Sequence, residues 1–142
     1  MRTYLLILSF LLGASVYAQS SPEGLWMSYD DDGKTATALV RIFKVNDQLI
    51  GQIEKVFGQQ AEAICRNCRG DRKNQTIVGL EIIRGVKVEA QNNKWTQGRI
   101  LDPEDGTEYK LVLELERAGQ TLVVRGYWGL FWRTQYWQRQ VQ

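Results

Sequence analysis

The feature that most constrains the fold is an alternation of apolar and polar residues with a period of two. Between positions 108 and 116 every second residue is apolar, and the residues between them are charged except Val112. The apolar positions are Tyr109, Leu111, Leu113 and Leu115. Neighbouring side chains of a strand point to opposite faces, so this pattern predicts an antiparallel strand with one buried face.

Further strand-forming segments are separated by turn-forming clusters such as Asp30–Gly33 and Asp102–Gly106. Gly85 is expected to form a bulge or bend before residues 86–90. The predicted strands cover residues 24–29, 35–45, 49–57, 77–83, 95–101, 108–116, 121–125 and 132–139. We predict an all-β fold, an eight-stranded antiparallel up-and-down barrel, because closure removes both exposed edges of a meander. Such a barrel is either filled by side chains or holds one small ligand, and both remain open.

Residues 1–18 have the features of a signal peptide. Arg2 supplies a positive charge, residues 4–12 form an apolar run, and Val16-Tyr17-Ala18 fits a small-residue cleavage site. The apolar run is too short for a helix to cross the hydrocarbon core of a bilayer, so no membrane span is expected. The mature protein would be a single domain over residues 19–142, located in the periplasm or outside the cell.

Composition excludes several classes of site. The chain has 18 basic and 16 acidic residues, and a net charge of +2 does not indicate a nucleic-acid partner. It contains no histidine, so Ser-His-Asp and Cys-His catalytic sites cannot be assembled. Two cysteines without an imidazole make a poor zinc site. We therefore expect no enzyme activity, no metal and no cofactor.

Cys65 and Cys68 form a C-x-x-C motif that allows two interpretations. A local disulfide would stabilise the fold by about 2 kcal/mol, since the loop it closes is short. A redox pair is the alternative, because the basic residues around the motif would favour a thiolate. A thioredoxin-type motif needs a following helix, and the polar run 70–76 does not predict one, so the disulfide is favoured.

Strand parity predicts where a ligand would bind. If eight strands alternate in direction, the first, third, fifth and seventh connections emerge at one end, provided that residues 86–90 are not a ninth strand. This end would carry Cys65, Cys68, Asp102 and Trp128, and barrel mouths are preferred small-molecule sites. We expect a largely apolar pocket there, with an arginine that anchors an acidic head group unless it faces solvent. The residues expected to bind the ligand are Tyr109, Leu111, Leu113, Arg125, Trp128 and Arg133.

Two resemblances carry the interpretation further. Gly24-Leu25-Trp26 resembles the Gly-x-Trp motif of lipocalins, in which an arginine near the last strand covers the tryptophan. Arg139, two residues after Trp137, is the candidate for that arginine.

A set of further motifs extends over the whole mature chain. They are Gly24 with Trp26, Cys65-x-x-Cys68-x-Gly70, Gly79-Leu80, Ile100-Leu101-Asp102-Pro103-x-x-Gly106-x-x-Tyr109, Arg125-Gly126-Tyr127-x-Gly129 and Arg133-Thr134-Gln135-x-Trp137-x-Arg139. In the order and spacing of these motifs, the mature chain resembles the family of small secreted bacterial proteins called domain of unknown function 2147, which is lipocalin-like. Trp132 stands where this family leads us to expect glycine. The resemblance implies the fold and the compartment but no catalytic residues.

The sequence thus predicts a secreted or periplasmic, non-catalytic protein that binds a small apolar or amphipathic molecule. One alternative is a thiol–disulfide protein that uses Cys65 and Cys68. Another is an envelope protein-interaction module that uses the aromatic loop from Trp128 to Phe131.

Overall fold

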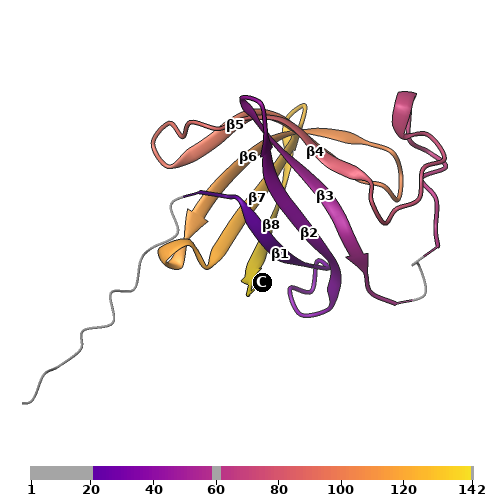
Figure 1. Cartoon of the computed structure of the whole chain (residues 1–142), viewed down its shortest axis with the longest axis horizontal. Coiled ribbons are helices and arrows are strands. Elements are labelled where there is room, and N and C mark those ends of the chain that lie inside the picture. The colour runs from indigo at the N-terminus through magenta and orange to yellow at the C-terminus, as the bar shows by residue number, and fades with distance from the viewer. Residues whose placement is uncertain (1–20, 59–61, 142) are drawn as a thin grey trace, which may run out of the picture.

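The computed structural model describes residues 21–58 and 62–141, and the predicted signal peptide lies outside these ranges. Eight antiparallel strands follow one another around a closed barrel in sequence order (Figure 1). The predicted fold class is therefore confirmed. The strands are β1 (Gly24–Tyr29), β2 (Ala36–Val45), β3 (Gln48–Val56), β4 (Glu81–Lys87), β5 (Lys94–Leu101), β6 (Glu108–Glu116), β7 (Thr121–Trp128) and β8 (Phe131–Gln140), with two short 3₁₀ turns, η1 (Gly70–Arg72) and η2 (Arg117–Gly119).

The barrel closes where the last strand pairs with the first. Three residue pairs join β1 to β8: Leu25 with Gln140, Trp26 with Arg139, and Met27 with Gln138. The two strands lie side by side in Figure 1, although they come from opposite ends of the chain. Each strand thus has two hydrogen-bonded neighbours, and neither end of the meander is left as an open edge.

The start of β4 differs from the prediction of a strand over 77–83. Residues 77–80 form a turn, in which the Leu80 N–H donates to the Ile77 carbonyl oxygen at 3.1 Å. Leu80 is nevertheless fully buried, so the apolar residues in this segment indicate burial and not a strand. The bulge expected at Gly85 is present, with a φ of +74° inside β4. β4 continues to Lys87, and residues 88–90 form no separate strand, so the alternation of connections holds across the described residues.

The interior of the barrel is occupied by side chains. Inward-facing residues of all eight strands form one buried cluster, which includes Trp26, Leu113 and Trp137. Gly51 leaves room for a larger neighbour, since a Cβ on it would lie 2.9 Å from Ile83. Of the two possibilities for an eight-stranded barrel, the described residues thus correspond to the filled one.

Trp26 and Arg139 seal one end of the barrel. The Arg139 guanidinium lies 4.2 Å from the centre of the fully buried Trp26 ring. It also donates to the carbonyl oxygens of Gly119, Glu23 and Ser21, at 2.6, 2.7 and 2.9 Å. The prediction that Arg139 covers Trp26 is confirmed. Glycine suits position 24, because its φ is +137° and a Cβ on it would lie 2.6 Å from an Arg139 nitrogen.

Candidate functional site

The described residues of four connections, 30–35, 57–58 with 62–80, 102–107 and 129–130, gather at the opposite end, which we call the mouth. Arg133 of β8 donates to Asp31 of the first connection, with the Nε–Oδ1 distance at 2.9 Å. Asn67 of the second donates to the Glu104 carbonyl oxygen at 3.2 Å. The parity prediction that these loops share one rim is therefore confirmed.

A disulfide joins Cys65 and Cys68 within the longest of these loops. Both cysteines are buried, and the Cys65 sulfur lies 3.3 Å from the Pro103 carbonyl oxygen of the neighbouring loop. Thiol–disulfide exchange requires a thiolate to reach a sulfur atom. The burial of both sulfurs therefore favours the structural interpretation of this pair.

An aromatic concavity of about 360 Å³ opens at the mouth. Three of the predicted ligand-binding residues line it: Tyr109, Trp128 and Arg133. Phe131 and Trp132 also line it, and both are largely exposed, at 73% and 67%. The other lining residue is Thr107.

Sequence reasoning did not single out Thr107 or Trp132 for this site. Nothing in the sequence marks Thr107, because its position depends on how the turn 102–107 folds over the rim. Trp132 carried a signal in that it departs from the glycine expected in the family. The β7–β8 hairpin keeps its register around this residue, with Tyr127 opposite Trp132, so the departure does not disturb the turn.

Leu111 and Leu113 lie deeper than expected. Their exposed fractions are 2% and 0%, and both belong to the buried cluster. Tyr109 lies above them, against Gly126 of β7, where a Cβ would come within 3.0 Å of the tyrosine Cβ. The two leucines therefore form the packed core beneath the concavity and do not line it.

The two arginines expected to anchor an acidic group are placed differently from that expectation. Arg125 lies opposite Val112 and Thr134, on the outer face, and its Nε donates to the Thr134 hydroxyl at 2.9 Å. Arg133 is at the mouth, but it is paired with Asp31, and its Nη1 lies 3.9 Å from an Asp102 oxygen. Because two carboxylates surround this one guanidinium, it has little positive charge to offer to an acid.

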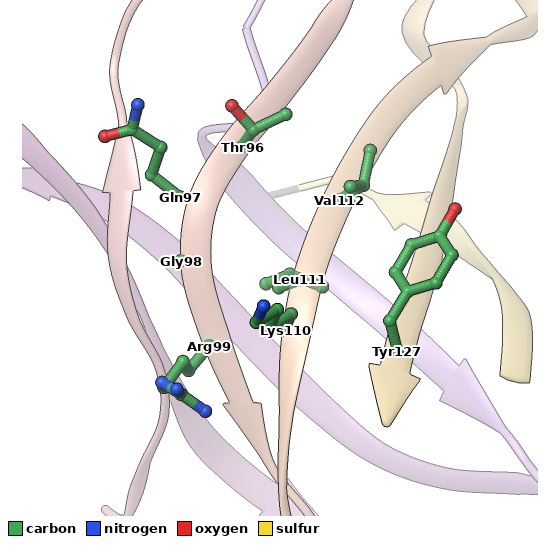
Figure 2. Close-up of a pocket in the computed structure, with 8 residues that line it drawn as sticks. All are labelled: Thr96, Gln97, Gly98, Arg99, Lys110, Leu111, Val112 and Tyr127. Atoms are coloured by element: carbon green, nitrogen blue, oxygen red, sulfur yellow. The ribbon is translucent and has the colours of Figure 1, made fainter. Parts of the chain in front are cut away.

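A second concavity, of about 370 Å³, lies on the outer face of β5, β6 and β7 (Figure 2). It contains two cations from neighbouring strands, Arg99 and Lys110. Neither of these two cations is among the ligand-binding residues predicted from the sequence. The remaining lining residues are Thr96, Gln97, Gly98, Leu111, Val112 and Tyr127.

Comparison with known proteins agrees with this architecture. Residues 24–139 match the model of a family described as uncharacterised proteins conserved in bacteria, DUF2147. The chain belongs to this family. The match covers Gly24 to Arg139, so Trp26 and Arg139, which seal one end of the barrel, both lie within the matched residues.

A solved structure shares the fold of this DUF2147 protein. Protein HP1028 from the human pathogen Helicobacter pylori, described as belonging to the lipocalin family, is similar with a TM-score of 0.70. The similarity covers 84% of this chain and 82% of that one at 15% sequence identity, so it concerns the fold alone. None of the curated proteins matches the chain.

Two classes of feature were absent from residues 21–58 and 62–141. No helix in this part of the chain has the length and apolar character needed to cross a membrane. The same residues contain no group of three or more cysteine, aspartate or glutamate side chains arranged to hold a metal ion.

Proposed function

We propose that this DUF2147 protein is a non-catalytic, exported binder of a small apolar or neutral amphipathic molecule, which it holds at the mouth of the barrel. The observation that carries the proposal is an open aromatic concavity above a filled interior. The ligand would therefore lie on the barrel rather than inside it.

The composition of the mouth supports an apolar ligand. Large exposed apolar groups that gather on one surface mark interaction sites. Trp128, Phe131 and Trp132 are each more than half exposed and line one concavity. Its volume of about 360 Å³ is at the lower end of the range for small-molecule sites. A single ring or a short alkyl chain would cover these aromatic faces.

The charges at the mouth support a ligand without an acidic head group. Asp31 and Asp102 face the single guanidinium of Arg133, so the local charge is negative when both carboxylates are ionised. An acid would meet this negative charge, whereas an alcohol would not. This preference is the reverse of the one expected from the sequence.

Calorimetric titration with a matched alcohol, amine and carboxylic acid of one chain length tests this proposal. We expect the alcohol and the amine to bind more tightly than the acid. Trp128→Ala or Phe131→Ala should weaken binding of the alcohol at least about tenfold, as for the loss of an aromatic contact. Tyr136→Ala is the matched control, because Tyr136 is 54% exposed but does not line the concavity. Tighter binding of the acid, or no effect of either mouth variant, would exclude this function.

Export is the second part of the proposal. The charged and apolar pattern of residues 1–18 supports it, and so does the disulfide, because disulfides persist in oxidising compartments. Fractionation followed by N-terminal sequencing is the test. We expect a periplasmic or secreted protein that begins at Gln19, and a cytoplasmic protein that retains Arg2 would contradict it.

A protein-interaction function is the second candidate, and one observation favours it. The tip of the β7–β8 hairpin projects Leu130, which is 91% exposed and does not line the concavity. Leu130→Asp should leave binding of the alcohol intact while it removes a protein partner in co-purification from the native host. If no partner depends on Leu130, this candidate is excluded.

A further inference from the structure

Five outward-facing side chains form a straight row across β4 to β8. Direct cross-strand pairs link each member to the next: Arg84 to Arg99, Arg99 to Lys110, Lys110 to Tyr127, and Tyr127 to Trp132. Neighbouring strands lie about 4.8 Å apart, so the row brings three cations and two aromatic rings close together. This row is separate from the residues of the mouth except for Trp132, which lines the mouth concavity.

The three cations of the row are expected to destabilise the folded protein. Like charges directly opposite each other in a sheet are destabilising. Arg84 is compensated, because Asp71 and Glu81 accept from it at 2.7 and 2.8 Å. Among the described residues, no carboxylate lies within 4.0 Å of the charged groups of Arg99 or Lys110, although both side chains are exposed. Residues that destabilise the fold locally are typical of functional sites.

The backbone of β5 is irregular beside these two cations. Its register against β6 shifts between Trp95 and Gly98, and Gln97 adopts a φ of +70°. A positive φ is uncommon for residues other than glycine and stores strain, which often accompanies a binding site. The shift coincides with the outer concavity, where Arg99 lies directly opposite Lys110 and Tyr127 stands on the next strand (Figure 2).

Three observations therefore coincide at this point: uncompensated cations, a strained bulge and a concavity of about 370 Å³. We propose that this outer concavity binds a small cyclic organic anion. Arg99 and Lys110 bind its carboxylate or phosphate group through charge-assisted hydrogen bonds. Tyr127 and Val112 contact the ring, and Thr96 and Gln97 offer additional polar groups at the rim.

Flanking charges limit the ligand to a small molecule. Glu114 lies four residues after Lys110 on the same outer face of β6, and Glu108 lies two residues before it. Arg72 already pairs with Glu108, so a polyanion that ran along β6 would meet repulsion at Glu114. Across the strands, Arg84 at the end of the row is already paired with two carboxylates, so the row offers two cations to one acid group.

A backbone-amide NMR titration of the protein tests this site with four probes: phenyl phosphate, benzoate, phenol and inorganic phosphate. We expect phenyl phosphate or benzoate to shift the signals of residues 96–99, 110–112 and 127, and to bind at least about tenfold more tightly than phenol. The tighter of the two acids identifies the acid group. Binding of inorganic phosphate as tight as that of phenyl phosphate would exclude a ring-bearing ligand.

Variants separate this site from the mouth. Arg99→Gln and Lys110→Gln should each weaken binding of the acid at least about tenfold, because each removes a charge-assisted contact. They should leave the unfolding temperature unchanged or higher, because each relieves a repulsion between like charges. Lys87→Gln is the control, since it removes one positive charge from the exposed end of β4 outside the concavity.

Three results would overturn the proposal. The first is unchanged affinity for the acid in both glutamine variants. The second is a set of shifts confined to the mouth residues, which would concern the proposed function instead. The third is tighter binding of a single-stranded oligonucleotide than of phenyl phosphate, which would exclude a site built for one acid group.

Discussion

Trp26 and Arg139 illustrate how single residues hold this barrel together. The indole is fully buried, and its Nε1 donates to the Pro22 carbonyl oxygen at 2.8 Å. Arg139 combines a stacking contact with three donated hydrogen bonds, and partial burial lowers the pKa of its guanidinium. The pair therefore joins the first strand, the last strand and the turn at Gly119.

We predict that Trp26→Ala lowers the free energy of unfolding by about 3 to 5 kcal/mol, as for a buried large-to-small change. Arg139→Ala should cost less, about 1 to 3 kcal/mol, because water can replace part of its hydrogen bonding. Urea denaturation followed by circular dichroism measures both values. A larger cost for Arg139→Ala would show that the hydrogen bonds, and not the buried ring, dominate this end.

Glycine substitutions at the mouth test its close packing. Gly106 has a φ of +77°, and a Cβ on it would lie 2.5 Å from the Asn67 carbonyl carbon and 3.1 Å from the Cys68 nitrogen. Gly129 has a φ of +59° and nothing within 4 Å of such a Cβ. We predict that Gly129→Ala costs about 1 to 2 kcal/mol, for the left-handed conformation alone. Gly106→Ala should cost more, because the turn must also move away from the cysteine loop, and equal costs in urea denaturation would contradict this.

At the scale of elements, the cysteine loop is held by more than its disulfide. The Cys65 N–H donates to the Gln75 carbonyl oxygen at 2.8 Å, and the Asn74 N–H donates to the Cys65 carbonyl oxygen at 2.9 Å. Arg84 reaches from β4 to Asp71 with two nitrogens, at 3.0 and 2.7 Å. These interactions remain when the sulfurs are separated.

The double variant Cys65→Ser, Cys68→Ser should therefore remain folded. We expect it to lose about 2 kcal/mol, because the disulfide closes only a short loop. Thermal denaturation with and without a reductant measures the loss. Unfolding on reduction alone would contradict this expectation, and exchange of the native disulfide with a model dithiol would support the thiol–disulfide function instead.

The pairing of Asp71 with Arg84 predicts a dependence on pH. The hydrogen bond from Arg84 is the main cause that lowers the pKa of the Asp71 carboxyl. A carboxyl with a lowered pKa in the folded state stabilises the fold above its ordinary pKa and loses this contribution as the pH falls through the lowered value. Asp71→Asn should therefore be less stable than the natural protein near neutral pH, and the difference should shrink between about pH 5 and pH 2.

The measurement is the unfolding free energy of both proteins over this range. The effect will be small, because Asp71 is 67% exposed and exposed ion pairs are screened by solvent. A difference that grows in acid would show that Asp71 acts through something other than its charge.

At the scale of the whole molecule, closure depends on a few residues at the end of the chain. Only three residue pairs join β1 to β8, and two of them involve Arg139 and Gln140. Val141, immediately beyond them, is 97% exposed. We predict that a chain ending after Trp137 loses cooperative unfolding, because the seam opens and Trp26 loses its cover. A chain that lacks only residues 141–142 should unfold like the natural protein in thermal denaturation, and equal behaviour of the two truncations would contradict the role of the seam.

Much of this organisation could be predicted, because period-two patterning reports strands directly. Prediction from this pattern failed where apolar residues are buried outside a strand, as at Ile77 and Leu80, whose backbones form a turn. It also failed to show which face Arg125 occupies. Residues 121–124 are all buried, so the preceding part of β7 shows no alternation from which the side could be inferred.

The sequence by itself determined the strands other than the start of β4, their up-and-down order and the end at which the long loops meet. Period-two alternation and turn chemistry are local properties, and strand parity follows from the number of strands. The resemblance of residues 24–26 to the Gly-x-Trp motif of lipocalins also predicted the contact between Trp26 and Arg139. Only the tertiary structure decided that the barrel is filled, that Arg133 is neutralised by Asp31, and that Arg99 lies opposite Lys110. These three outcomes depend on cross-strand register and on distances between segments far apart in the chain, and a one-residue change of register would move each side chain to the other face.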